Sequence, residues 1–287
     1  MMERSTTSLT VERVDLERQS AQADVVATEE PMEICVVWPD GGVMATESVA
    51  VTMRTPGDDF ELAVGFLCSE GIVRERGHVL DVSYCPDPHD VQQFNIVNVT
   101  LSPDAGFDRA MLNRNFYATS SCGVCGKASL EALRLMGADS LPSDNLLLSG
   151  DVVRSLPDAL RAAQPVFART GGLHASGLFD ADGSLITVRE DVGRHNALDK
   201  VVGHHLMADD LPLRDRVLVV SGRASWELMQ KALTAGIPAV VAVGAPSSLA
   251  VELARDFGMT LIGFARSDGF NIYADAGRIV SASEHHA

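Results

Sequence analysis

The C-terminal part of the chain alternates apolar strands with helical segments, and this alternation constrains the fold more than any other feature. Strands are predicted at 216–220, 239–243 and 260–264, and the segments between them, 226–235 and 248–257, have the pattern of helices. Strands joined in sequence through helices pair in parallel, with right-handed crossovers. The sequence therefore predicts an α/β fold with parallel strands in this part of the chain.

The N-terminal part has a different pattern. Residues 32–38 and 43–54 flank the turn Pro39-Asp40-Gly41-Gly42, which predicts a hairpin. A helix is predicted next, with Asp58 or Asp59 as its N-cap and its end at Gly71. Two further strands, at 79–84 and 94–101, complete a small sheet. We expect a smaller α+β domain here.

These patterns divide the chain into four segments. The polar residues 1–30 are expected to be a loose, poorly ordered leader, because they carry many charges and no apolar run. The other three are an α+β domain at 31–119, a connector at 120–169 with a CxxC loop and helices near 129–136 and 152–163, and an α/β domain at 170–287 that opens with a hairpin (172–179 and 185–188) and a helix from about Arg194.

Composition excludes several classes of function. The formal net charge is −16, which argues against binding nucleic acid or an anionic membrane through bulk charge. No secretory signal stands at the start, and the uncharged stretch 232–251 is interrupted by glycine and proline, so no membrane span is expected. Five cysteines do not describe a disulfide framework. We expect a cytoplasmic protein with reduced thiols.

Two cysteines stand three residues apart, directly before a predicted helix. Cys122 and Cys125 lie in Ser-Ser-Cys-Gly-Val-Cys-Gly-Lys, residues 120–127. A helix N-terminus and the nearby Lys127 would lower the pKa of such a thiol and favour the thiolate. Three interpretations remain open at this point: a redox dithiol, half of a zinc site, and a nucleophile that carries sulfur as a persulfide.

The zinc interpretation has one specific form, the base-deaminase signature H-x-E followed by P-C-x-x-C. Here the cysteine pair precedes His174, no glutamate follows that histidine two residues later, and no proline precedes Cys122. The other cysteines have no partner at ligand spacing and are predicted to be packing residues. These are Cys35, Cys68 and Cys85.

A dense charged cluster spans residues 189–200, at a strand-to-helix junction. Asp199 and Lys200 fit the pattern of solvated charges on a helix face. The segment before them is too polar for a strand with one buried face, and we expect its side chains to line the same cavity as the CxxC loop. They are Glu190, Asp191, Arg194 and His195.

Three loops rich in Gly, Ser and Arg follow the predicted parallel strands, at 221–223, 244–248 and 265–269. Ligands of such sheets bind at the carboxyl edge, and Ser247 and Ser248 would place free backbone N–H groups at a helix start. Each loop alone also fits an ordinary turn. Together they predict an anion-binding edge, beside which Gly172 and His174 follow a glycine turn, although a lone histidine is more often structural.

Seven sequence blocks in a fixed order resemble the FdhD family of formate dehydrogenase accessory sulfurtransferases. They cover about residues 32–280. In chain order they are RTPGDDFELAVGFLCSEGI from Arg54, SSCGVCGK from Ser120, TGGLH from Thr170, REDVGRHNALDK from Arg189, SGRASWE from Ser221, APSSLA from Ala245 and LIGFAR from Leu261.

The resemblance implies a sulfur carrier. Such proteins take sulfur from a cysteine desulfurase as a persulfide, here on Cys122 with Cys125 assisting, and pass it to the molybdenum bis(molybdopterin guanine dinucleotide) cofactor that formate dehydrogenase requires. It further implies a cytidine-deaminase-like C-terminal fold without a structural metal, and a homodimer. The residues expected to bind the cofactor or a guanine nucleotide are Phe264, Ala265, Arg266, Ser267, Asp268 and Gly269, with Arg223, Ser248, Gly172, His174, Glu190, Asp191, Arg194 and His195.

Two other functions compete with this one. The first is a non-catalytic chaperone that binds the molybdenum cofactor and uses the CxxC pair only for redox control. The second is a zinc deaminase, which the inverted order of cysteines and histidine disfavours. A mass gain on Cys122 or Cys125 after incubation with a desulfurase distinguishes the carrier from the chaperone, and metal analysis for stoichiometric zinc tests the deaminase.

Overall fold

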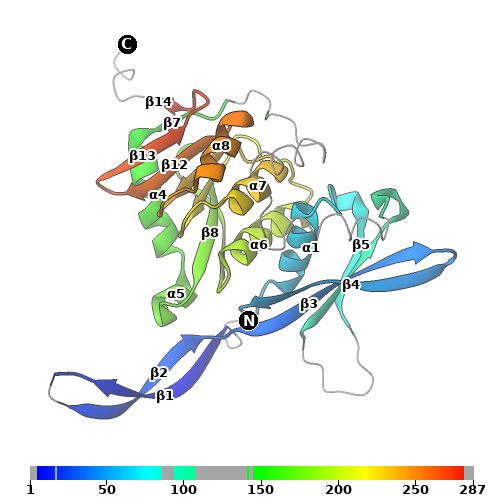
Figure 1. Cartoon of the computed structure of the whole chain (residues 1–287), viewed down its shortest axis with the longest axis horizontal. Helices are drawn as coiled ribbons and strands as arrows, with labels where there is room; N and C mark the ends of the chain where they lie inside the picture. The colour runs from blue at the N-terminus through cyan, green and yellow to red at the C-terminus, as the bar shows by residue number, and fades with distance from the viewer. Residues whose placement is uncertain (1–4, 17, 86–93, 108–140, 142–144, 281–287) are drawn as a thin grey trace.

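The computed structural model describes residues 5–16, 18–85, 94–107, 141 and 145–280. Cys122, Cys125, Lys127 and the helix predicted near 129–136 lie outside these residues. Figure 1 shows two sheets with helices between them and a hairpin that leaves the body at one end. No helix in the described ranges is long and apolar enough to cross a membrane.

A six-stranded sheet forms the C-terminal half, in the order β13-β12-β11-β10-β8-β9. The predicted parallel strands are its centre: β10 (Val217–Val220) pairs in parallel with β11 (Ala239–Ala242), and β11 with β12 (Thr260–Arg266). The predicted hairpin of β8 (His174–Phe179) and β9 (Leu185–Asp191) joins antiparallel to β10. Strand β13 (Gly269–Ala274), which was not predicted, pairs antiparallel with β12.

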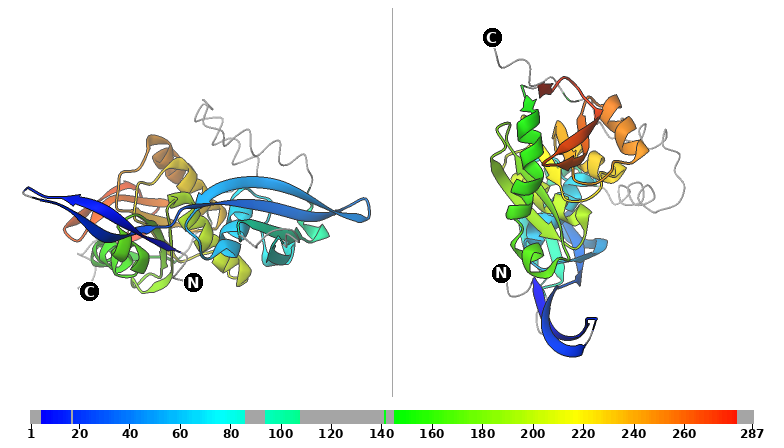
Figure 2. Two further views of the ribbon diagram at one scale, coloured as in Figure 1. Left: turned by 90° about the horizontal axis from the view of Figure 1, so that it is seen from below. Right: turned by 90° about the vertical axis from the view of Figure 1, so that its left-hand side faces the viewer.

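Both faces of this sheet are covered, so its central strands are apolar throughout. Val217 and Val219 of β10 face the helix α4 (Gly150–Ala162), whereas Leu218 and Val220 belong to the core on the opposite side. That opposite side carries α6 (Arg194–Met207), α7 (Trp226–Thr234) and α8 (Ser248–Asp256) (Figure 2). Helix α4, in the segment predicted as a connector, therefore packs on the C-terminal sheet.

The N-terminal sheet has four strands in the order β4-β3-β6-β5. The predicted hairpin is present as β3 (Glu30–Asp40) and β4 (Val43–Arg54), and the two further strands as β5 (Val79–Tyr84) and β6 (Ile96–Leu101). Helix α1 (Asp59–Ser69) starts after Asp58, whose side chain makes no capping hydrogen bond. The remaining short elements are η2 (Arg76–His78), η3 (Pro103–Ala105), β7 (Leu148–Ser149), α5 (Pro165–Thr170) and β14 (Ile279–Val280).

Two glycines bring α1 and α6 into backbone contact. A Cβ on Gly65 would lie 1.8 Å from the carbonyl oxygen of Asp199, and one on Gly203 would lie 1.9 Å from that of Glu61. Only glycine permits helices to cross this closely. Buried side chains of both sheets, such as Val99 and Val240, belong to one continuous cluster around these helices.

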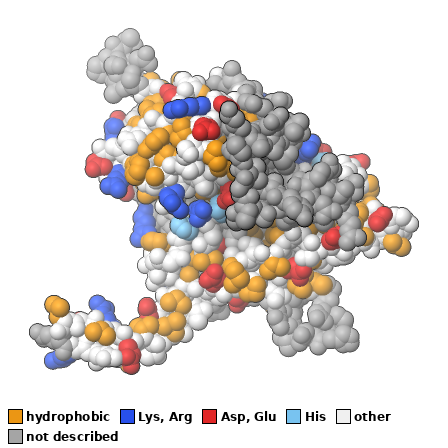
Figure 3. All heavy atoms as spheres, in the orientation of Figure 1, with side chains coloured by type: hydrophobic (Ala, Val, Ile, Leu, Met, Phe, Trp, Pro, Cys, Tyr) orange, Lys and Arg blue, Asp and Glu red, His pale blue; other side chains and the backbone are white. Residues whose placement is uncertain are grey.

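The expected loose leader is instead a regular hairpin. Strand β1 (Thr6–Val14) pairs with β2 (Gln19–Ala27) in an unbroken antiparallel register. The tip of the hairpin extends away from the body, with apolar and charged side chains mixed on its surface, while β2 also contacts α5 (Figure 3). The prediction was wrong because the charges of this segment do not prevent strands, whereas its Thr and Val residues favour them.

Candidate functional site

The three loops at the carboxyl edge of the parallel strands lie side by side, as the alternation predicted. The Gly244 N–H donates to the Gly222 carbonyl at 2.9 Å, and the Phe264 N–H donates to the Gly244 carbonyl at 3.1 Å. A further bond runs from the Ser247 N–H to the Ala224 carbonyl at 3.0 Å. The edge is therefore one connected surface.

Two details of the predicted edge are wrong. The N–H of Ser247 is not free, because it donates to Ala224, and the Ser247 hydroxyl accepts from the Ala250 N–H as a helix cap. Residues 264–269 are not a loop: β12 continues to Arg266, which pairs with Gly269 of β13 across a two-residue turn. Since β12 is followed by an antiparallel strand, the chain turns sharply instead of crossing over.

A cavity of about 680 Å³ lies between this edge and the helices α4 and α5. It brings together predicted residues from two distant segments, Gly172 with His174 and the run Ala265 to Ser267. Arg161 and Phe167, which the sequence did not single out, also line it. The other predicted ligand residues are not among its lining residues: Phe264, Asp268, Gly269, Arg223, Ser248, Glu190, Asp191, Arg194 and His195.

The cavity wall combines positive charge with an aromatic ring. The guanidinium of Arg161 lies 3.7 Å from the ring centroid of Phe167, and Arg266 is exposed at the turn between β12 and β13. Burial lowers the pKa of His174, and the nearby charges of Arg194 and His195 lower it further. His174 is therefore favoured as a neutral ring. The wall supplies positive charge through Arg161 and Arg266, and it also contains the carboxylate of Asp158.

One buried polar side chain of the cavity was missed by the sequence interpretation. Gln164 lies between α4 and α5 and is 3% exposed, yet its Nε2 atom has no hydrogen-bond partner among the described residues. Its signal in the sequence was weak: only the following Pro165, a common first residue of a helix, marks the position.

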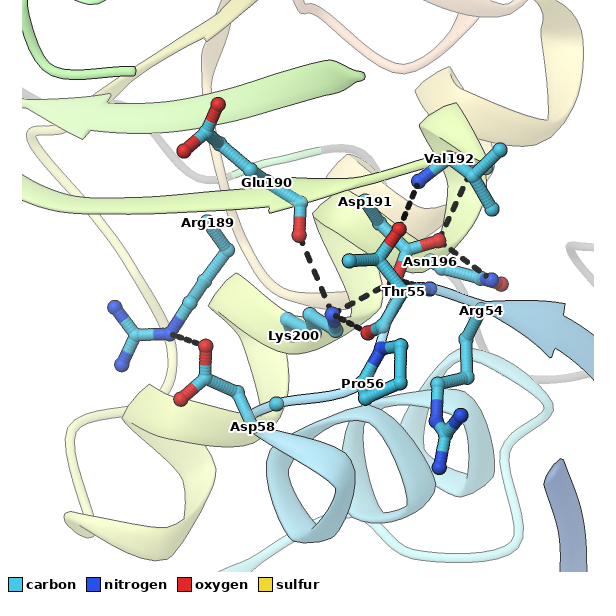
Figure 4. A network of polar contacts seen from close by, with 12 residues as sticks. Arg54, Thr55, Pro56, Asp58, Arg189, Glu190, Asp191, Val192, Asn196 and Lys200 are labelled. Carbon is cyan, nitrogen blue, oxygen red and sulfur yellow. Dashed lines mark hydrogen bonds and ion pairs between the residues drawn. The ribbon is translucent and has the colours of Figure 1, made fainter. Parts of the chain in front are cut away.

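The side chains of Glu190 and Asp191 make hydrogen bonds and ion pairs within the fold, and neither lines the cavity of about 680 Å³. Asp191 is fully buried, and its Oδ2 atom lies 2.7 Å from Nζ of Lys200 and accepts from the Thr55 N–H at 3.1 Å. Lys200 also donates to the carbonyls of Thr55 and Glu190 (Figure 4). The Glu190 carboxylate accepts from two N–H groups of α5 and borders a separate cavity of about 340 Å³. The CxxC loop, with which they were predicted to share a cavity, lies outside the described residues, so that prediction stays untested.

The expectation that Asp199 and Lys200 are solvated was wrong. Asp199 is buried, and both of its carboxylate oxygens lie 2.8 Å from Nζ of Lys231, while the Ser69 hydroxyl donates to it at 2.7 Å. Asp199 follows His195 by four residues, and this spacing suggested that both lie on an outer helix face. The packing of α1 and α7 over α6 covers that face instead.

Arg194 and His195 lie close to the cavity without lining it. The Nε2 atom of His195 lies 2.8 Å from the carboxylate of Glu227, at the first turn of α7. That hydrogen bond lowers the pKa of Glu227. Nε of Arg194 is buried and has no partner within the described part of the chain. Arg194 contributes positive charge near the edge, whereas His195 is paired with a carboxylate.

The described cysteines suit packing better than chemistry. Cys35 and Cys68 are buried, and burial raises the pKa of Cys35 to about 11 and that of Cys68 to about 12. Thiols with such values are almost wholly protonated at neutral pH and are poor nucleophiles. Cys85 is half-buried. Cys35 and Cys68 are therefore unsuited to nucleophilic chemistry, and Cys122 and Cys125 lie outside the described residues.

Comparison with known proteins gives consistent matches over nearly the whole chain. The profile of the FdhD/NarQ family matches residues 27–280. Proteins named sulfur carrier protein FdhD are 51% identical in Mycolicibacterium paratuberculosis, covering 90% of this chain and 93% of that protein, and 40% identical in Saccharolobus solfataricus, covering 94% and 98%. A crystal structure of a candidate formate dehydrogenase accessory protein from Desulfotalea psychrophila has a TM-score of 0.72 at 22% identity, covering 96% of this chain and 99% of that one, which supports the fold.

Proposed function

Because this chain belongs to the FdhD/NarQ family, we propose that it is a sulfur carrier that serves formate dehydrogenase. It accepts sulfur from a cysteine desulfurase as a persulfide and delivers it to the molybdenum bis(molybdopterin guanine dinucleotide) cofactor. Delivery to this cofactor is supported by the cavity of about 680 Å³ at the carboxyl edge, with its arginines and an amide that has no hydrogen-bond partner among the described residues.

The residues of the cavity fit one nucleotide half of the proposed acceptor. Its volume lies within the range of roughly 300–1,000 Å³ that is usual for small-molecule sites. In a protein of net charge −16, phosphate must be held by local donors, and Arg266, Arg161 and the Ser267 hydroxyl lie at this cavity. Neutral His174 adds a ring nitrogen that can donate or accept.

Sulfur loading is assigned to Cys122. Its thiolate attacks the terminal sulfur of the desulfurase persulfide, a new S–S bond forms on Cys122, and the desulfurase cysteine leaves as a thiolate. Cys125 then has a defined use: its thiolate can attack Sγ of Cys122 and release the carried sulfur as sulfide, leaving a disulfide for an external thiol to reduce. Sulfurtransferase activity and the cytoplasmic site of this reaction are parts of the same proposal.

Mass spectrometry of the intact protein tests the carrier function. After incubation with a cysteine desulfurase and cysteine, the wild type is expected to gain mass in steps of about 32 Da, the mass of one sulfur atom, whereas Cys122→Ala gains none. Cys85→Ser is the matched control, because it removes a half-buried thiol that the proposal does not use. Cys125→Ala should still load sulfur and release it slowly.

Two outcomes would overturn the carrier function. Absence of any mass gain on the wild type would favour a chaperone that binds the cofactor without carrying sulfur. Full activation of formate dehydrogenase by Cys122→Ala, in cells that lack the wild-type protein, would exclude Cys122 as the carrier. Size-exclusion chromatography with light scattering checks the proposed homodimer in the same preparations.

A further inference from the structure

The cavity contains one polar group whose hydrogen-bonding capacity is unused. Gln164 is 3% exposed, it lines the cavity, and its Nε2 atom has no partner among the described residues. A buried donor without an acceptor is unfavourable, because it has lost its bonds to water and gained none in return. A position of this kind is expected to meet an acceptor from a bound molecule.

The local backbone explains why this amide is available. Gln164 occupies the N-cap position of α5 but makes no side-chain capping hydrogen bond. The carboxylate of Glu190 performs that task from the neighbouring strand, accepting from the N–H groups of Val166 at 2.9 Å and Phe167 at 2.7 Å. Since α5 is capped from outside, the Gln164 side chain is left to face the cavity.

The cavity wall combines apolar and charged side chains. Leu160, Leu173 and Ala265 are buried apolar residues of the wall, suited to the faces of a flat ring. Arg161 and Arg266 supply charge for phosphate. A single amide donor in a wall that is mostly apolar can fix the orientation of a ring through one acceptor on its edge, because small-molecule sites use a few precisely placed polar groups among apolar ones.

We propose that Gln164 determines which base this cavity accepts, its Nε2 donating to the O6 carbonyl oxygen of a guanine ring. This inference rests on the proposed function, from which the guanine nucleotide follows. Guanine carries the acceptor O6 where adenine carries an amino donor. A site built to satisfy a particular polar group discriminates strongly against a ligand that leaves the group unpaired. Gln164 is thus a specificity residue, and Glu190 is its positioning residue.

Calorimetric titration of the full chain with GDP, IDP and ADP tests the inference. IDP shares O6 with GDP and lacks only the exocyclic amino group, whereas ADP lacks O6. Gln164→Leu removes the donor at similar size, and Gln164→Glu replaces it with an acceptor. Gln22→Leu, on the exposed surface of the β1–β2 hairpin, is the matched control. Thermal unfolding of each unliganded variant is measured in parallel.

The expected result is a loss of affinity for GDP and IDP of about tenfold to a hundredfold in Gln164→Leu, with a larger loss in Gln164→Glu. ADP should bind the wild type more weakly than GDP and respond little to Gln164→Leu. The unliganded Gln164→Leu protein should keep its melting temperature, because the substitution removes an unpaired buried donor. If Gln164 served stability alone, Gln164→Leu would lower the melting temperature and leave the affinity for GDP unchanged.

Three results would overturn the inference, and they are distinguishable. Equal GDP affinity in the wild type and Gln164→Leu would exclude the base contact while leaving the nucleotide site in place. An equal loss for ADP and GDP would mean that Gln164 contacts the sugar or phosphate rather than O6. Undetectable GDP binding to the wild type would remove the proposed nucleotide site itself, and the base contact with it.

Discussion

Lys200 and Asp191 form a buried ion pair on which several main-chain groups depend. Lys200 is 1% exposed and Asp191 is fully buried. Lys200→Met leaves the carboxylate uncompensated, so a loss of about 3–5 kcal/mol in the free energy of unfolding is expected. Urea titration followed by circular dichroism measures it. The double variant Asp191→Asn with Lys200→Met should recover part of the loss, and a double variant less stable than Lys200→Met would contradict this.

Arg266 is the most direct candidate for a phosphate contact. Replacing it with alanine should weaken GDP binding about tenfold, the lower part of the range for a charged hydrogen bond, because the side chain is exposed and screened by solvent. The matched control is Arg214→Ala, an exposed arginine before the amino end of β10. Calorimetry with identical affinities for Arg266→Ala and wild type would exclude a direct contact.

His205 makes stability depend on pH. Burial lowers its pKa below the ordinary value of 6.5, and this outweighs the hydrogen bond to Asp210, which acts in the opposite direction. A lowered pKa means that the unfolded chain binds the proton more readily, so stability is fully present above pH 6.5 and is lost as pH falls through the lowered value. Melting temperatures should therefore decrease between pH 7.5 and 5.5.

His205→Gln identifies the source of that dependence. The variant should show a shallower decrease, with a remainder from His174, whose pKa is lowered for the same reason. A decrease as steep as that of the wild type would mean that His205 does not contribute.

At the scale of elements, the crossing of α1 and α6 requires glycine. Gly203→Ala would force a methyl group against the Glu61 carbonyl and separate the helices, at an expected cost of about 3 kcal/mol. Gly77→Ala is the matched control, because a Cβ there meets nothing closer than a side-chain oxygen of Glu75 at 3.7 Å. Thermal unfolding of both variants compares them, and similar losses would refute the special role of the crossing.

The sequence predicted the central elements because their patterns are local. The parallel strands are continuous apolar runs between helices, and each of their loops follows a strand directly. Pairing between distant segments has no such signal: β8 joins β10 antiparallel. Strand β13 returns beside β12 through a local two-residue turn, which was not predicted. The candidate site was predicted in part for the same reason. His174 and Arg266 lie at strand ends next to recognisable glycine-containing turns. The position of Gln164 depends instead on how Glu190 caps a neighbouring helix.

At the scale of the whole molecule, both sheets share one core. The two tryptophans report on its halves, since Trp38 lies in β3 and Trp226 starts α7. We expect Trp38→Phe and Trp226→Phe, each with one remaining tryptophan, to show fluorescence transitions in urea that coincide with the circular dichroism transition of the same variant. Separate midpoints within either variant would mean that the two halves unfold independently.

The glycine crossing also bears on how the protein moves. Where two backbones touch at reciprocal points, neither helix can roll over the other without breaking the contact, so the crossing resists motion of one sheet against the other. We expect the motions that admit a ligand to lie in the wall of the cavity itself, in the short helix α5 and the turn between β12 and β13. In an NMR relaxation-dispersion experiment, exchange on the microsecond-to-millisecond timescale is expected mainly in those two segments, and α1 and α6 are expected to show little of it.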